Sequence, residues 1–381
     1  MSSRSVTALL SLALSALVTW PLRGQDAGEA LIRRLNAAHR GQWFTTLTFV
    51  QHTTFGGTAR PAETWYESMR RPGLLRLDVE RDGRMISRTI FRHDSVYATG
   101  PNGNTVARPQ VHDLLVLLHD LHVGDADVIV RTLRQVGYDL SRAVRAQWRD
   151  RPVTIVGVSS VADSASRQFW VDDTSELVVR VRERTSDGSF RDIHVGAVAP
   201  VARGSVEQEV EMFSNGRLTL REDYQDVHTD VDLPAAVFDP AVTALPGWVQ
   251  ATRVQRSDFA ARVARTADSL RAIAAPAGGF AAAPVAVGDA ARVAMVLRID
   301  DGRWIPPHTH NLPKHLMVLQ GTLLVGHGER LATTGLHEVG SGGTTRMSPQ
   351  TAHYEGARGL TLVLLEAGAG FTTTWVGSGA R

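Results

Sequence analysis

The chain has 381 residues, of which 43% are hydrophobic and 21% charged, which suffices for substantial cores and suggests two or three domains. Lysine and arginine number 41 against 39 for aspartate and glutamate, and the resulting formal net charge of +2 gives no support to nucleic-acid binding. The chain has no cysteine, which excludes disulfides, thiolate metal sites and lipid attachment through a thiol.

The first residues have the pattern of a secretory signal peptide, which we predict over residues 1–24. Arg4 precedes an apolar stretch from Val6 to Trp20 that is shorter than the about 20 residues of a membrane span, and a polar segment follows Gly24. An uncleaved membrane anchor is the alternative, because Leu22 is a poor residue at that distance from a cut after Gly24. We therefore expect a periplasmic or secreted bacterial protein with no membrane span after cleavage.

Residues 25–245 have the pattern of a large antiparallel sheet with helical segments. Apolar residues on a helical period predict a helix over residues 26–41. Period-two alternation with regular turn signals then predicts a series of strands, which a helical segment over residues 110–140 interrupts and which ends at residues 231–240. One helix and one helical insert among many strands predict a curved antiparallel half-barrel with a helical plug.

Several motifs mark this strand pattern, among them "TWYESMRRPGLLRLDV", "FWVDD" and "VDLPAAVFDP". Their order over Asp26 to Pro240 resembles the LolA-like superfamily of outer-membrane lipoprotein carriers. The resemblance implies a concave apolar surface that shelters acyl chains or another hydrophobic segment, hence a small-molecule or lipid-like apolar ligand. Ordinary core packing is an equal alternative for the candidate lining residues, which are Trp65, Tyr66, Phe91, Phe169 and Trp170.

A connecting region follows at residues 246–280. Its Ala- and Arg-rich part, residues 256–275, has apolar residues roughly on one stripe and predicts a helix. The Ala/Pro/Gly-rich stretch over residues 275–289 predicts a flexible connection. The helix is a candidate homodimer contact, although the oligomeric state stays open.

Short strands and turns recur in residues 281–381 and predict a small all-β domain. The segment "WIPPHTHNLPKHLMVLQG" (Trp304 to Gly321), together with Gly302 before it and His353 after it, resembles the cupin family. The resemblance covers Phe280 to Val376 and implies a barrel of the double-stranded β-helix type.

Three histidines are the candidate metal ligands: His308, His310 and His353. Residues two apart on a strand share a face, so His308 and His310 point into the barrel, and a partner strand can bring His353 to complete the set. Imidazoles suit Fe, Mn, Zn, Ni or Cu, and three protein ligands leave coordination positions open, as in catalytic sites.

Lys314 stands where the cupin resemblance places an acidic ligand, and an ammonium repels a cation. Three outcomes stay open: a three-histidine centre with Lys314 turned to solvent, a site that borrows another ligand such as His315, or a metal-free barrel with a lysine-gated pocket. In an enzyme, Lys314 would be a substrate-anion anchor or a base with a lowered pKa.

Three further histidines, His112, His119 and His122, lie on the predicted helical insert at spacings of seven and three. On one ideal helix they share a face, and an amphipathic or core-edge stripe is favoured there over a metal patch.

The favoured interpretation is an exported two-domain binding protein, with a half-barrel for an apolar ligand and a cupin pocket that holds a divalent metal. Two alternatives stay open. One is a metal-dependent cupin oxygenase, isomerase or hydrolase, and the other is a metal-free sensor or interaction module without catalysis.

Overall fold

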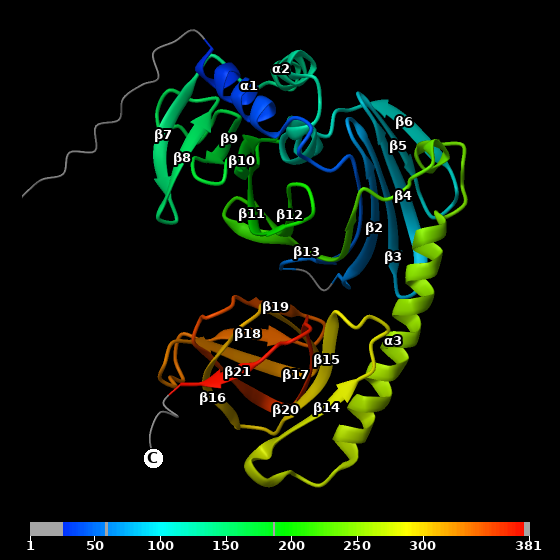
Figure 1. Ribbon diagram of the computed structural model, residues 1–381, viewed down its shortest axis with the longest axis vertical. Coiled ribbons are helices and arrows are strands. Elements are labelled where there is room, and N and C mark those ends of the chain that lie inside the picture. Colours follow the sequence, from blue (N-terminus) through cyan, green and yellow to red (C-terminus); the bar gives the residue numbers. More distant parts are fainter. Residues whose placement is uncertain (1–25, 58–59, 186, 377–381) are drawn as a thin grey trace, which may run out of the picture. The chain divides into compact units, whose positions relative to one another are not determined.

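The computed structural model describes residues 26–57, 60–185 and 187–376. The predicted signal peptide lies outside these residues. The chain divides into two compact units with the boundary between Ala244 and Leu245, and strands dominate both units (Figure 1). In the part of the chain that is described, no helix has the length and apolar character needed to cross a membrane.

The first unit is built on one antiparallel sheet. Its strands are β1 (Thr46–Thr54), β2 (Glu63–Arg70), β3 (Leu74–Arg81), β4 (Arg84–Arg92), β5 (Ser95–Thr99), β6 (Thr105–Pro109), β7 (Ala143–Trp148), β8 (Arg151–Val156), β9 (Gln168–Asp172), β10 (Val178–Arg184), β11 (Phe190–Pro200), β12 (Ser205–Ser214) and β13 (Arg217–Thr229). The order β6-β5-β4-β3-β2-β1-β13-β12-β11-β10-β9-β8-β7 joins two meanders where the first strand pairs with the last. Figure 1 shows this sheet curling around the helical segments, which confirms the predicted half-barrel with a helical plug.

The helical plug consists of the predicted N-terminal helix and of an insert that is divided into three short helices. Helix α1 (Ala27–His39) buries its apolar stripe in the main core of the unit. The insert predicted as a single helical segment is divided into a π-helix η1 (Leu115–His119), a 3-10 helix η2 (Asp120–His122) and α2 (Ala126–Gln135). The Asn36 side chain of α1 donates hydrogen bonds of 2.9 Å to two carbonyls at the end of this break, those of Leu121 and Gly124.

The second unit is a small eight-stranded barrel preceded by a helix. Helix α3 (Gly247–Ala272) and the 3-10 turn η4 (Ala277–Gly279) lead into β14 (Phe280–Val285), β15 (Arg292–Ile299), β16 (Trp304–His310), β17 (Lys314–His327), β18 (His337–Gly340), β19 (Thr344–Met347), β20 (His353–Gly368) and β21 (Thr373–Trp375). The order β14-β15-β20-β16-β21 forms one path, and β17 pairs with β18, β19 and β20. The predicted mainly β fold of both units is confirmed.

Alternation along β15 and β20 separates the barrel interior from the face that α3 covers. Leu297, Val363 and Leu365 belong to the interior core, whereas Val296 and Leu364 pack with the buried stripe of α3. Each strand is therefore buried on both faces. The helix is longer than predicted and begins at Gly247 rather than near residue 256.

The prediction of a flexible connection over residues 275–289 is wrong. Residues Phe280 to Val285 form β14, which pairs in antiparallel register with β15 from Phe280↔Ile299 to Val285↔Ala294. The small side chains of Ala281 and Ala283 pack beneath α3, and Pro284 is tolerated because β14 is an edge strand.

Candidate functional site

The three predicted ligand histidines meet inside the barrel. β16 supplies His308 and His310, β20 supplies His353, and His308 and His353 are register partners on neighbouring strands. All three side chains are buried, and their nearest ligand atoms lie within 4.8 Å of one another. No other such group of three or more His, Cys, Asp or Glu ligands is found among the described residues.

Backbone carbonyls determine the tautomers of two of these rings. Nδ1 of His308 lies 2.7 Å from the carbonyl oxygen of Pro306, and Nδ1 of His353 lies 2.8 Å from that of Thr351. A carbonyl can only accept a hydrogen bond, so both Nδ1 atoms carry the proton in the neutral ring and the Nε2 lone pairs are left for a ligand. The remaining ring, His310, has its Nδ1 at 3.2 Å from the Thr373 hydroxyl.

Burial keeps these imidazoles neutral. Burial, followed by the charge of Lys314, lowers the pKa of His310 to about 3. Burial also lowers the pKa of His353 to about 4 and that of His308 below its ordinary value, although the carboxylate of Glu355 opposes both shifts. Within the part of the chain that is described, Nε2 of His310 and Nε2 of His353 have no hydrogen-bond partner. Neutral rings with unpartnered, buried nitrogens are the form that binds a metal ion.

Lys314 points into this site rather than toward solvent. The residue is only 3% exposed, its ammonium donates to Oε1 of Glu355, and it lies 3.4 Å from Nε2 of His308. The outcome with Lys314 turned to solvent is therefore wrong. His315, the borrowed ligand considered from the sequence, follows Lys314 on β17 and is on the less buried face of the strand.

Glu355 is the site residue that the sequence analysis missed. Its carboxylate is buried, with Oε2 at 3.4 Å from Nε2 of His308 and Oε1 at 3.5 Å from Nε2 of His353. Burial alone raises the pKa of Glu355, but the charge of Lys314 and the neighbouring histidines more than offset this and lower it. The period of two in "HYE" could have revealed it, because Glu355 shares a strand face with His353.

The three imidazoles fit a first-row transition metal once their ligand nitrogens move slightly closer to one another. Two ligand atoms that each lie about 2.1 Å from one ion can be at most about 4.2 Å apart. The nitrogens here spread to 4.8 Å, so at least one ring must move by about half an ångström. Three neutral imidazoles with a carboxylate nearby suit Fe, Mn, Zn, Ni or Cu better than Mg or Ca.

A second candidate site is a cavity of about 250 Å³ in the half-barrel. Most of its lining is apolar and comes from strands and plug alike, including Trp65, Met69, Leu75, Leu77, Leu115 and Met212. Drug-sized ligands occupy pockets of about 300 to 1,000 Å³. The cavity is therefore suited to a small apolar group or one short alkyl chain.

The five predicted lining aromatics have different locations. Trp65 lines the cavity, whereas Phe91 and Phe169 lie in the main core of the unit. Tyr66 directly follows the inward-facing Trp65 on β2. In the same way, Trp170 follows Phe169 on β9, and Trp170 belongs to a separate core cluster. Because consecutive strand residues point to opposite faces, both members of such a pair cannot line one cavity.

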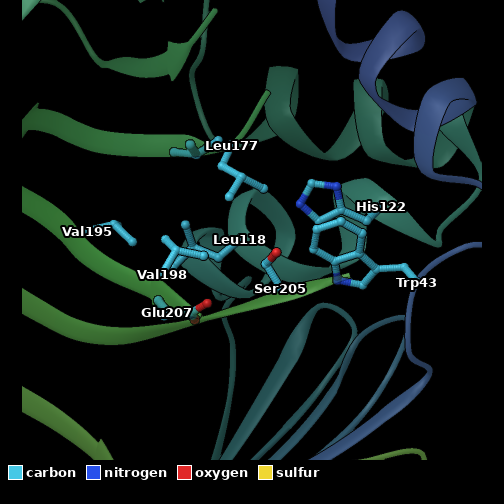
Figure 2. A pocket seen from close by; sticks show the side chains of 9 residues that line it. Trp43, Leu118, His122, Leu177, Val195, Val198, Ser205 and Glu207 are labelled. Atoms are coloured by element: carbon cyan, nitrogen blue, oxygen red, sulfur yellow. The ribbon is translucent and has the colours of Figure 1, made fainter. Parts of the chain in front are cut away.

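Two of the three histidines of the helical insert, His112 and His119, line the half-barrel cavity, whereas His122 lines a separate space. The three rings have different neighbours: His112 packs edge-on against Phe91 at 4.6 Å, His119 places Nε2 at 3.0 Å from Glu207 Oε1, and His122 stacks on Trp43 at 4.0 Å. Figure 2 shows the Trp43 and His122 rings beside a space of about 20 Å³. This space has room for about one water molecule, which is too small for an organic ligand.

Glu222 on β13 gives the half-barrel a testable dependence on pH. Burial raises the pKa of Glu222 from 4.5 to about 7, although the Tyr224 hydroxyl donates to its Oε2 at 3.1 Å. Because the unfolded chain ionises first, folding free energy is lost as pH rises from about 4.5 to about 7. We expect Glu222→Gln to stabilise the unit by roughly 3 kcal/mol at pH 8 and to leave it unchanged at pH 4.

Hydrogen exchange of the β13 amides at the two pH values measures this effect. Glu211→Gln is the matched control, because Glu211 lies on β12 outside the cavity and is paired with Arg221 at 3.5 Å. Equal stability of Glu222→Gln and the unsubstituted protein at pH 8 would contradict the expectation.

Comparisons with known proteins give structural similarities only. No family model matches the chain, and no curated protein does. A putative outer membrane lipoprotein-sorting protein domain from Vibrio parahaemolyticus is similar at 8% identity with a TM-score of 0.42, over 57% of this chain and 97% of that one. A LolA superfamily protein from Nitrosomonas europaea is similar at 9% identity with a TM-score of 0.38, over 56% and 97%. A cupin superfamily protein from Desulfitobacterium hafniense is similar at 13% identity with a TM-score of 0.21, over 25% of this chain and 82% of that one.

Proposed function

We propose that this chain is an exported, periplasmic or secreted two-domain binding protein. Its half-barrel (residues 25–245) takes a small-molecule or lipid-like apolar ligand, and its cupin barrel (residues 281–381) holds a divalent transition metal, with residues 246–280 connecting the two. The observation that best supports the metal is the convergence of three buried, neutral imidazoles whose ligand nitrogens lie within 4.8 Å of one another.

The residues that would hold the metal are His308, His310 and His353. The carboxylate of Glu355 is the oxygen donor nearest to them, and Lys314 holds it by an ion pair. Lys314 thereby neutralises the one negative charge in a site whose other donors are uncharged. In this arrangement Lys314 supports Glu355 rather than presenting a free ammonium to the ion.

A metal-dependent cupin enzyme is the second candidate function. It is favoured by the buried Lys314–Glu355 pair, because an acid and a base in contact beside open coordination positions are suited to proton transfer. A divalent ion bound there would supply Lewis acidity to a substrate oxygen or to water. The chain's own contribution would be to orient substrate and to hold a proton at Nζ of Lys314 or on Glu355.

Metal content of the purified protein tests the proposal. We expect about one transition-metal ion per chain, and a loss of more than about tenfold in affinity for His308→Ala, which removes one of three imidazole ligands. His337→Ala is the matched control, because His337 is an exposed histidine of β18 outside the triad.

The number of metal ions per chain distinguishes a metal-binding barrel from a metal-free one. A value far below one ion per chain in the unsubstituted protein, after incubation with each of the five metals, would leave a metal-free sensor or interaction module. Native mass spectrometry for a co-purified apolar molecule tests the half-barrel separately.

A further inference from the structure

Three carboxyl groups line the otherwise apolar half-barrel cavity. They belong to Glu67 of β2, Glu207 of β12 and Glu222 of β13, and the exposed fractions of these residues are only 5%, 6% and 7%. A buried carboxylate is costly unless a cation or several hydrogen bonds compensate it. The partners of these three groups therefore indicate what the cavity is built to receive.

One of the three carboxylates has a basic partner. Oε1 of Glu207 lies 3.0 Å from Nε2 of His119. Burial by itself raises the pKa of Glu207, but the neighbouring His119 and the more distant Arg71 lower it. Arg71 uses its guanidinium to donate to the backbone carbonyls of Phe44 and His119. His119 is thus engaged by Glu207, and Arg71 by backbone carbonyls outside the cavity lining.

The other two carboxyl groups have no basic partner among the residues that the structure describes. Glu222 accepts a hydrogen bond from the hydroxyl of Tyr224, which is neutral. The carboxyl group of Glu67 has neither a hydrogen bond nor an ion pair within the described residues, and its side chain shares the inward face of β2 with Trp65 and Met69. Burial raises its pKa, and so does repulsion from Glu222 and Glu207. Glu67 is therefore a buried, unpartnered acceptor that faces the cavity.

The remaining titratable group of the lining is His112. Its Nδ1 accepts the backbone N–H of Leu115 at 3.1 Å, and burial lowers its pKa, so it adds no positive charge. The cavity wall thus has three carboxyl groups and only one base that is paired with any of them, His119, so Glu67 and Glu222 lack a positive partner in the lining. A ligand that places hydrogen-bond donors and a positive charge beside Glu67 and Glu222 would give both carboxyl groups a partner.

We propose that the half-barrel binds an alkyl amine, with its ammonium group between Glu67 and Glu222 and its chain along the apolar wall. This inference rests on the proposed function of the half-barrel and specifies the ligand's chemical class. An ammonium offers three donors and one positive charge. A fatty acid or a phosphate head would add a further anion to the same place and is disfavoured. The cavity volume of about 250 Å³ restricts the ligand to one short chain.

Three eight-carbon probes that differ only in the head group test this inference at pH 7.5: octylammonium, octanol and octanoate. Displacement of a neutral apolar dye from the purified protein gives the affinity of each. We expect octylammonium to bind about tenfold or more tightly than octanol, since a charge-assisted hydrogen bond is about twice as strong as a neutral one. Octanoate should bind most weakly.

Variants show whether Glu67 and Glu222 are responsible. Glu67→Gln and Glu222→Gln keep the side-chain shape and remove the carboxyl group that can ionise against an ammonium, so each should reduce the preference for the amine while octanol affinity changes by less than about threefold. Glu211→Gln, on the same sheet but outside the cavity, should change neither. The retained octanol affinity also shows that each variant is folded.

The outcomes separate this inference from the proposed function. If octanoate or octanol binds as tightly as octylammonium, or if both glutamine variants keep the full amine preference, the amine class is wrong while apolar binding stands. If none of the three probes displaces the dye, the proposed half-barrel function fails and the inference fails with it.

Discussion

Replacement of Lys314 by methionine is expected to destabilise the metal-free barrel by about 3 to 5 kcal/mol. The ammonium of Lys314 is the cationic partner of Glu355, and both residues are at most 3% exposed. Methionine fills a similar volume, so the main effect is an unpaired buried carboxylate. Hydrogen exchange of the β17 and β20 amides measures this loss in the second unit alone.

A double variant and a metal titration show whether the charge is the cause. Lys314→Met combined with Glu355→Gln removes both charges and should recover most of the lost stability, because a buried pair is often replaceable by neutral groups. A divalent ion at the triad should also recover it, since the released carboxylate gains a cation. A Lys314→Met protein as stable as the unsubstituted one would show that the ion pair does not form.

Replacement of Arg76 by methionine is expected to destabilise the half-barrel by a similar amount, about 3 to 5 kcal/mol. Arg76 on β3 is fully buried and binds Asp78 through two bonds, Nε to Oδ2 at 2.7 Å and Nη2 to Oδ1 at 3.0 Å. It also donates to the backbone carbonyls of Val237 at 3.1 Å and Ala244 at 2.9 Å. The substitution therefore leaves one carboxylate and two carbonyls without their donor.

Arg76→Lys distinguishes geometry from charge. Lysine keeps the positive charge but cannot form the paired bonds of a guanidinium, so it should recover only part of the stability. Hydrogen exchange of the β3 amides is the measurement, and Arg84→Met, at an exposed position of the adjacent strand β4, is the control. An Arg76→Met loss no larger than that of Arg84→Met would contradict the expectation.

Strand periodicity accounts for what the sequence predicted well. His308 and His310 are two residues apart, so any strand over "PHTH" places both rings on one face, whichever sheet forms. The half-barrel followed in the same way from alternation and turns. The face on which a strand residue lies and the positions of turns depend on residues close together in the sequence, so both can be predicted from it.

Contacts between distant segments account for what it missed. The ion pair of Lys314 with Glu355 joins residues 41 positions apart, and nothing near Lys314 in the sequence shows that its ammonium has a buried carboxylate to meet. The strand β14 was read as a flexible connection, because its alanines and proline are typical of linkers and only pairing with β15 makes it a strand. The broken helical insert likewise depends on the side chain of Asn36, far away in α1.

The main-chain hydrogen bonds of the triad have a consequence for how this barrel can evolve. Because peptide oxygens two residues upstream hold the rings of His308 and His353, their aim does not depend on the identity of any neighbouring side chain. Substitutions in the surrounding wall can therefore alter the charge and size of the site while two of the three imidazoles keep their direction. Natural variation should consequently be broad around the imidazoles, and the buried cation of Lys314 is one feature that such a framework tolerates.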